Sequence, residues 1–148
     1  MLLSTLTQWS HEHIARIFTS TNDEDSLRAL EETFSQDVVA RLNGRQIKFD
    51  DIKRSVLALR REAVGYGGLR VHWEHSVEAS EESNRHGSFG GAYVIRGIHR
   101  KLPGEAEPIE FERRKTVIVQ IESQDDSTER DSRIIVDIVF VAMDVRVA

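Results

Sequence analysis

The spacing of apolar residues changes once along this chain of 148 residues, near the glycine-rich connection at positions 65–68. Before it, apolar side chains recur every three or four positions, which is the period of an amphipathic helix. After it, apolar and polar side chains alternate, which is the period of a strand. Helices followed by a run of strands predict an α+β fold, in which three N-terminal helices pack on a strongly curved, mostly antiparallel sheet.

Three segments carry the helical period. Residues 2–18 form the first, with leucine, isoleucine and tryptophan gathered on one side. A break at 20–25 precedes the second helix, and either Thr21 or Asn22 can serve as its N-cap. Residues 49–63 form the third helix, which begins with two aspartates that interact favourably with the helix dipole.

A short hairpin separates the second and third helices. Residues 38–42 alternate weakly and lead into Asn43 and Gly44, a dipeptide that tolerates positive φ at both centres of a type I′ turn. The chain is therefore expected to fold straight back through residues 45–47.

Four longer segments have the strand period, at residues 69–80, 89–100, 109–122 and 133–147. In the first, strict alternation places Trp73 and His75 on the same apolar face. The last is apolar on both faces over much of its length, so both faces must be covered. Because a helical layer covers only one face of a sheet, the sequence predicts a homodimer joined through the other.

Charge and composition limit the class of partner. A net charge of -5 and a pI near 5.7 argue against a nonspecific nucleic-acid binder, which needs a basic face. The basic cluster at Arg113, Arg114 and Lys115 is divided, because alternate strand residues point to opposite faces, and we expect it to lie at a solvated sheet edge.

The chain has no cysteine, no cationic leader before its first apolar residues and no run of about 20 apolar residues. These features predict a cytoplasmic protein that does not span a membrane. The length suits one domain, with no linker or internal repeat.

Phe34, Asp37, the Asn43–Gly44 turn and the helix that begins at Phe49 form an ordered set. This set resembles the superfamily of nuclear transport factor 2-like and SnoaL-like domains, in which an aromatic-x-x-Asp motif starts the first strand and a turn and a helix lead into a curved sheet. The order of elements is similar to that of uncharacterised fungal SnoaL-like proteins. The resemblance implies one cone-shaped α+β domain over residues 1–148. The superfamily holds isomerases, dehydratases, cyclases and hydrolases beside members that only bind or assemble.

The resemblance also bears on catalysis. In the ketosteroid isomerases of the superfamily, the proton-abstracting carboxylate lies five positions after the motif aspartate, where this chain has Leu42. A leucine cannot transfer a proton, so that isomerase chemistry is not expected. His75 and Asp137 resemble an acid/base pair that projects into the cone, and they are the predicted catalytic residues. The alternatives are that each is a satisfied buried polar group, or that Asp137 faces the dimer interface.

The remaining expectations concern a pocket. The residues predicted to line it, unless they simply fill the core, are Trp9, His13, Trp73, Tyr93 and Phe140. No phosphate loop, nucleophile elbow or metal-ligand spacing is present, so neither cofactor nor metal is expected. Two functions stay open: cofactor-free acid/base chemistry on a small apolar molecule, and a noncatalytic binding or dimeric assembly domain.

Overall fold

The computed structural model describes residues 2–81, 83–127 and 129–147. Its helices are α1 (Leu6–Thr19), α2 (Asp23–Thr33) and α3 (Phe49–Arg61). Its strands are β1 (Phe34–Leu42), β2 (Arg45–Ile47), β3 (Arg70–Ser80), β4 (Gly87–Arg100), β5 (Ile109–Ser123) and β6 (Arg133–Arg146). The strands form one sheet in the order β2-β1-β6-β5-β4-β3, in which only the β1–β6 pair is parallel. This confirms the predicted α+β architecture.

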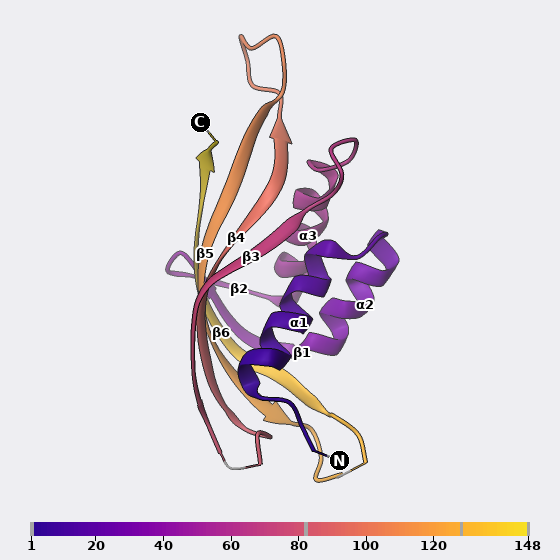
Figure 1. Cartoon of the computed structure of the whole chain (residues 1–148), viewed down its shortest axis with the longest axis vertical. Coiled ribbons are helices and arrows are strands. Elements are labelled where there is room, and N and C mark those ends of the chain that lie inside the picture. Colours follow the sequence, from indigo (N-terminus) through magenta and orange to yellow (C-terminus); the bar gives the residue numbers. More distant parts are fainter. Residues whose placement is uncertain (1, 82, 128, 148) are drawn as a thin grey trace.

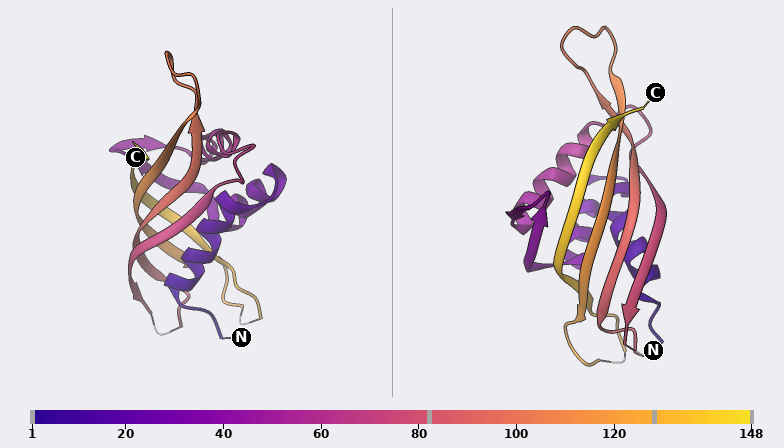
Figure 2. Two further views of the ribbon diagram at one scale, coloured as in Figure 1. Left: turned by 45° about the horizontal axis from the view of Figure 1, so that its top comes forward. Right: turned by 90° about the vertical axis from the view of Figure 1, so that its left-hand side faces the viewer.

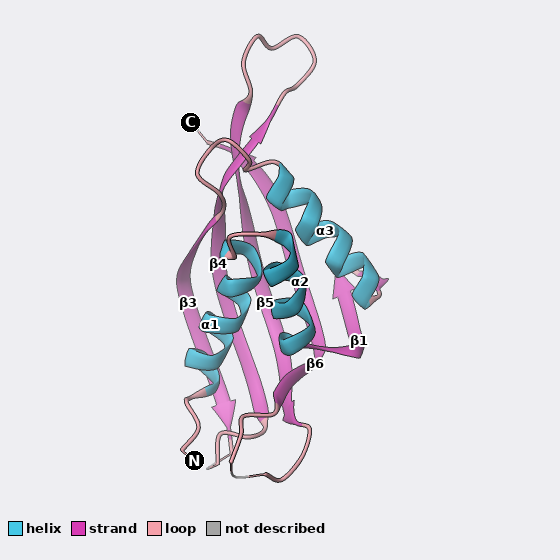
Figure 3. Cartoon of the chain, turned by 90° about the vertical axis from the view of Figure 1, so that its right-hand side faces the viewer, coloured by secondary structure: helices cyan, strands magenta, loops and turns pink. Residues whose placement is uncertain are grey.

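The sheet is long and strongly curved, and the three helices lie together on its concave side (Figures 1 and 3). The opposite face of the sheet carries no helix in the described part of the chain (Figure 2, right). The buried core therefore lies between the helical layer and the concave face, with Trp9, Phe89 and Tyr93 among its largest members. No helix within the described ranges has the length and apolar content needed to cross a bilayer.

The two N-terminal helices begin at residues that cap their free N–H groups. Helix α1 starts at Leu6 rather than at residue 2, because Thr5 and Gln8 form a capping box. For α2 the open choice between two caps is decided in favour of Asn22, whose side-chain oxygen accepts a hydrogen bond from the Asp25 N–H at 2.8 Å.

The hairpin forms at the predicted turn. Asn43 and Gly44 have φ angles of 50° and 83°, the left-handed values that a type I′ turn requires. Strand β1 begins at Phe34, directly after α2, which is where the sequence resemblance placed the start of the first strand.

A β-bulge corrects the predicted position of His75. The register of β3 against β4 shifts between Trp73 and His75, so the alternation of side chains reverses at that point. Beyond the bulge, Ser76 faces α1, where its hydroxyl lies 2.8 Å from His11 Nε2. His75 and Val77 are exposed. His75 therefore does not share the inward face with Trp73.

A second bulge determines the orientation of Asp137. Residue Asp137 pairs with Gln120 of β5, but Ile135 pairs with the adjacent Ile121, so Val136 is the extra residue on β6. Ile135 and Ile138 are both buried, and Asp137 is exposed. Both faces of β6 are apolar as predicted, but the bulge changes which residues belong to each.

Candidate functional site

The predicted catalytic pair is not assembled within one chain. His75 lies on β3 and Asp137 on β6, and β4 and β5 run between them. Three interstrand spacings separate these strands, which amounts to roughly 14 Å. Both side chains are also exposed, away from the helical layer. Neither residue therefore lies in the interior between the helices and the sheet.

A small apolar cavity of about 20 Å³ lies between the helices and the concave face of the sheet. Its lining residues come from all three helices and from β1, β4, β5 and β6: Ile14, Ile17, Phe18, Leu30, Phe34, Val56, Tyr93, Lys115, Ile138 and Phe140. Tyr93 and Phe140 of the predicted pocket set belong to this lining, whereas Trp9, His13 and Trp73 do not. Lys115 brings the amine of its side chain into this otherwise mostly apolar lining.

Lys115 projects from β5 into an aromatic surrounding. Its Nζ atom lies 4.9 Å from the ring centroid of Phe140, 5.2 Å from that of Phe18 and 5.5 Å from that of Tyr93, its direct cross-strand partner. Within the described ranges no carboxylate lies within 4 Å of Nζ, and no side-chain hydrogen bond to it is formed. The amine is therefore held by aromatic ring faces alone.

This surrounding changes the acidity of the amine. Burial disfavours the ammonium form and, together with the positive charge of Arg113, lowers the pKa of Lys115 from about 10.5 to about 7, although Asp144 acts in the opposite direction. At neutral pH the amine is therefore divided between its neutral and protonated forms. A neutral amine is a base and a nucleophile, and an ammonium is neither.

A second, open pocket of about 220 Å³ reaches Lys115 from the side of α3. It is lined by Leu42, Asn43, Ser55, Arg113, Lys115, Phe140, Ala142 and Asp144. Lys115 and Phe140 line both the small apolar cavity and the open pocket, so they lie where the two meet. The open pocket makes the Lys115 side chain accessible from solvent.

An ion-pair network forms the polar side of this open pocket. Asp144 accepts hydrogen bonds from Arg113 at 2.7 and 3.1 Å and pairs with Arg100 at 2.7 Å, and Arg100 also donates to Glu62 at 2.6 and 2.9 Å. Burial raises the pKa of Asp144, but the hydrogen bonds from Arg113 and Arg100 outweigh it and leave that pKa lowered. Because both arginines engage Asp144, its carboxylate stays ionised without neutralising Lys115 directly.

A larger pocket, of about 440 Å³, lies elsewhere, beside the end of α1 and the glycine-rich connection 65–68. Its lining includes one charged side chain, Arg60, which already donates to Asp23 at 2.9 Å and to the Phe18 carbonyl at 3.0 Å. This hollow therefore offers space but no free reactive group in the described part of the chain.

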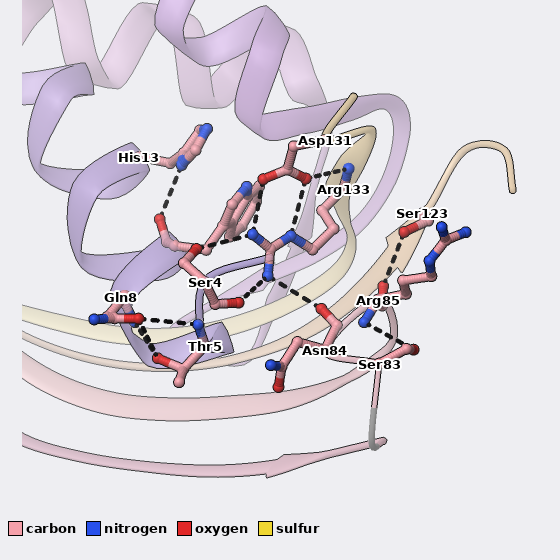
Figure 4. A network of polar contacts seen from close by, with 11 residues as sticks. Ser4, Thr5, Gln8, His13, Ser83, Asn84, Arg85, Ser123, Asp131 and Arg133 are labelled. Carbon is pink, nitrogen blue, oxygen red and sulfur yellow. Dashed lines mark hydrogen bonds and ion pairs between the residues drawn. The ribbon is translucent and has the colours of Figure 1, made fainter. Parts of the chain in front are cut away.

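His13 lies beside a network of polar contacts around Arg133 (Figure 4), and it stacks on Trp9. Arg133, which is fully buried, donates to Asp131 at 2.7 and 2.9 Å and to the carbonyls of Ser4 and Asn84 at 2.7 and 3.0 Å. Its guanidinium lies 5.8 Å from the Trp9 ring, and His13 stacks on the Trp9 ring with centroids 4.3 Å apart. This network ties the N-terminal segment to two loops at the ends of β3 and β6.

The remaining predicted pocket residue, Trp73, packs between α1 and the sheet. Its ring stacks on His11 with centroids 4.1 Å apart and lies 4.5 Å from that of Tyr93. Burial lowers the pKa of His11, which favours the neutral imidazole in this stack. Among the described residues no group of three or more histidine or carboxylate side chains is arranged to hold a metal ion.

One feature of the sequence indicates that Lys115 faces the interior, although the basic cluster to which it belongs favours an exposed position. Arg113 and Lys115 share a strand face opposite Arg114, and the basic cluster was expected at a solvated edge. Arg114 is indeed exposed, but Arg113 and Lys115 point toward the concave side. A lysine that shares a face with buried Val117 and Val119 is the feature that indicates an internal amine.

No protein-family model matches the chain, and no curated protein sequence matches it. Among solved structures, a candidate isomerase of the SnoaL-like family from Agrobacterium tumefaciens is similar at 10% identity with a TM-score of 0.54, over 92% of this chain and 96% of that one. A candidate polyketide cyclase from Xanthomonas campestris shares 14% identity with a TM-score of 0.52, over 90% of both chains.

A chain of the Mtr2–Mex67 M domain complex from Candida albicans shares 14% identity with a TM-score of 0.53, over 96% of this chain and 98% of that one. Candidate enzymes and a protein assembly thus share one architecture, so these similarities establish the fold and leave the activity open. The chain therefore has the nuclear transport factor 2-like cone fold of the SnoaL-like proteins, as the resemblance in its sequence implied.

Proposed function

We propose that this domain binds a compact, largely apolar molecule in the open pocket beside Lys115, and that Lys115 acts there as a cofactor-free proton acceptor. The observation that carries the proposal is the position of this amine, where an apolar cavity and an open pocket meet. A general base works best when its pKa lies near the working pH, and the Lys115 pKa of about 7 meets that condition.

The pocket also indicates the size and polarity of the ligand. Its volume of about 220 Å³ lies below the roughly 300–1,000 Å³ of pockets for drug-sized molecules, so a ligand with one or two small rings fits best. Phe140 and Leu42 provide apolar contacts, and the Arg113–Asp144 pair provides a polar side. A carbonyl compound with an acidic C–H bond has the matching chemistry.

The proposal is tested with 5-nitrobenzisoxazole, a compact bicycle that loses its C3 proton to a base while the N–O bond breaks and a coloured phenolate is released. The rate should rise with pH to a plateau with a midpoint near 7. Lys115→Met removes the amine and Lys115→Arg replaces it with a permanently protonated group, so each should lower kcat/KM by about tenfold or more.

Lys101→Met is the matched control, because Lys101 is an exposed lysine outside the pocket. It should leave the rate and its pH midpoint unchanged. Wild-type rates in folded Lys115→Met, checked by circular dichroism, would show that another group removes the proton and would contradict the proposal.

A second candidate, a homodimeric assembly, is supported by the bare face of the sheet (Figure 2, right). Exposed apolar residues on this face include Val77 on β3, Ile118 on β5 and Val141 and Met143 on β6, each at least 60% exposed. Direct cross-strand pairs connect these strands. Val77 of β3 pairs with Gly90 of β4, Gly90 pairs with Ile118 of β5, and Ile118 pairs with Val139 of β6. An apolar row that crosses four strands is typical of a surface that a partner covers.

A further inference from the structure

The surroundings of Lys115 suit a reaction beyond proton transfer. A lysine becomes a nucleophile toward carbonyl carbon when it is desolvated and free of a carboxylate partner. The Lys115 side chain is half-buried, three aromatic rings lie within 5.5 Å of its Nζ atom, and the nearby carboxylate of Asp144 is occupied by Arg100 and Arg113.

We infer that Lys115 captures an aldehyde or ketone as a covalent iminium, which makes the pocket a site for compact apolar carbonyl compounds. The inference rests on the ligand pocket of the proposed function, and it adds a covalent bond between the carbonyl carbon of the ligand and Lys115.

The reaction balances with groups that are present. The lone pair of neutral Nζ forms a bond to the carbonyl carbon, and a proton moves from nitrogen to oxygen to give a carbinolamine. Loss of the hydroxyl as water, with uptake of one proton, gives the iminium cation. No oxidant, reductant or cofactor takes part, because one amine, one carbonyl and one proton yield one iminium cation and one water.

The aromatic rings offset part of the cost of placing a cation at this half-buried position. The ring faces of Phe18, Tyr93 and Phe140, now 4.9–5.5 Å from Nζ, attract a cation at the same position. Asp144 lines the pocket on the polar side and supplies a compensating negative charge.

The other lysines, Lys48, Lys53 and Lys101, serve as references for the reactivity of an ordinary lysine amine. Lys53 pairs with Glu31 at 3.8 Å and lies over the Phe49 ring, while Lys48 and Lys101 are exposed. A lysine in a model peptide, with a pKa of about 10.4, is neutral at pH 7 in only about one molecule in 2,500. Selective capture at pH 7 therefore distinguishes Lys115 from an ordinary surface amine.

The experiment uses benzaldehyde as the probe. The whole chain is incubated at pH 7 with benzaldehyde and sodium cyanoborohydride, which reduces an iminium to a stable benzylamine, and the adduct is located by peptide mass spectrometry. We expect benzylation of Lys115 at least tenfold faster than that of Lys48, Lys53 or Lys101. In urea the preference should disappear, because the unfolded chain no longer desolvates the amine.

Lys115→Arg keeps the charge but cannot form an iminium, so it should lose this adduct while the slow labelling of the other lysines persists. Equal labelling of all lysines in the folded protein would overturn the inference. Proton removal from 5-nitrobenzisoxazole without an adduct on Lys115 would also overturn it and leave the proposed function standing. An adduct without proton removal would support covalent capture and contradict the role of Lys115 as a general base.

Discussion

Asp144 on β6 receives two hydrogen bonds from Arg113, the residue directly opposite it on β5, with Nε to Oδ1 at 2.7 Å and Nη2 to Oδ2 at 3.1 Å. The negative charge of Asp144 partly counteracts the lowering of the Lys115 pKa. Asp144→Asn removes that charge, so the pKa of Lys115 should fall further. The midpoint of the rate of 5-nitrobenzisoxazole cleavage should then move below pH 7, as measured between pH 5 and 9.

The same substitution leaves Arg113 and Arg100 without their shared carboxylate, and the free energy of unfolding should fall by about 1–3 kcal/mol in urea titrations. Arg114→Gln is a suitable control, because Arg114 is exposed and contacts Glu112 instead. A midpoint that moves to higher pH in Asp144→Asn would contradict the electrostatic coupling of Asp144 to Lys115.

Lys115→Met should make the protein more stable at pH 7. The folded-state pKa of Lys115 is about 7 and the unfolded value is near 10.5, so between these values the unfolded chain binds more protons. The contribution of Lys115 to stability therefore rises with pH across that window and is least favourable below pH 7. Replacement of this amine by an apolar side chain of similar length should add about 1–4 kcal/mol at neutral pH.

The measurement is the difference in unfolding free energy between Lys115→Met and wild type at pH 6, 7, 8 and 9. The difference should shrink as the pH rises, because the free-energy cost of releasing the Lys115 proton on folding falls as the pH approaches the unfolded-state pKa. A constant difference would mean that the pKa of Lys115 is not lowered in the folded protein.

Arg133→Met should destabilise the fold by about 3–5 kcal/mol, because it leaves Asp131 and the carbonyls of Ser4 and Asn84 without their buried donor. Thermal unfolding followed by circular dichroism measures the loss. Arg130→Met is the matched control, since Arg130 pairs with Asp125 at an exposed site and should contribute about 1 kcal/mol or less. Equal losses of stability in the two variants would show that the hydrogen bonds of Arg133 do not stabilise the fold more than an exposed ion pair does.

Ile118→Lys tests the homodimer. Light scattering should give the molar mass of a dimer for the wild type at micromolar concentration. A charge in the centre of the apolar row should raise the dissociation constant of the dimer by at least tenfold. Val64→Lys, at a residue that is 75% exposed in the α3–β3 connection, should leave the dimer unchanged. A monomeric wild type under these conditions would contradict the assembly.

The parts of the fold that local chemistry specifies were predicted from the sequence. The Asn43–Gly44 turn needs two positive φ values that few other dipeptides tolerate, and the third helix begins at Phe49 where the apolar period begins. Alternation also assigned Trp73 correctly to the side of the core. These features depend on neighbours in the chain.

The faces of β3 and β6 could not be predicted in the same way. The bulge after Trp73 has no glycine to mark it, and the extra residue on β6 is an ordinary valine at position 136. A bulge depends on the pairing of its strand with a neighbouring strand and bends the sheet locally, so the sequence of one strand does not mark it. Lys115 was missed for a related reason: its surroundings come from α1, β4 and β6, so its pattern on β5 alone resembled a solvated rim.

The parallel pairing of β1 with β6 has a consequence for how the chain folds. Asn43, at the end of β1, exchanges side-chain hydrogen bonds with the backbone of Ala142, 99 residues later in the chain. During synthesis, β1 and β2 therefore leave the ribosome as a hairpin with an open edge, long before the strand that completes it. Closure of so long a loop costs entropy before any contact compensates for it, so insertion of β6 between β1 and β5 should be the late and slow step of folding.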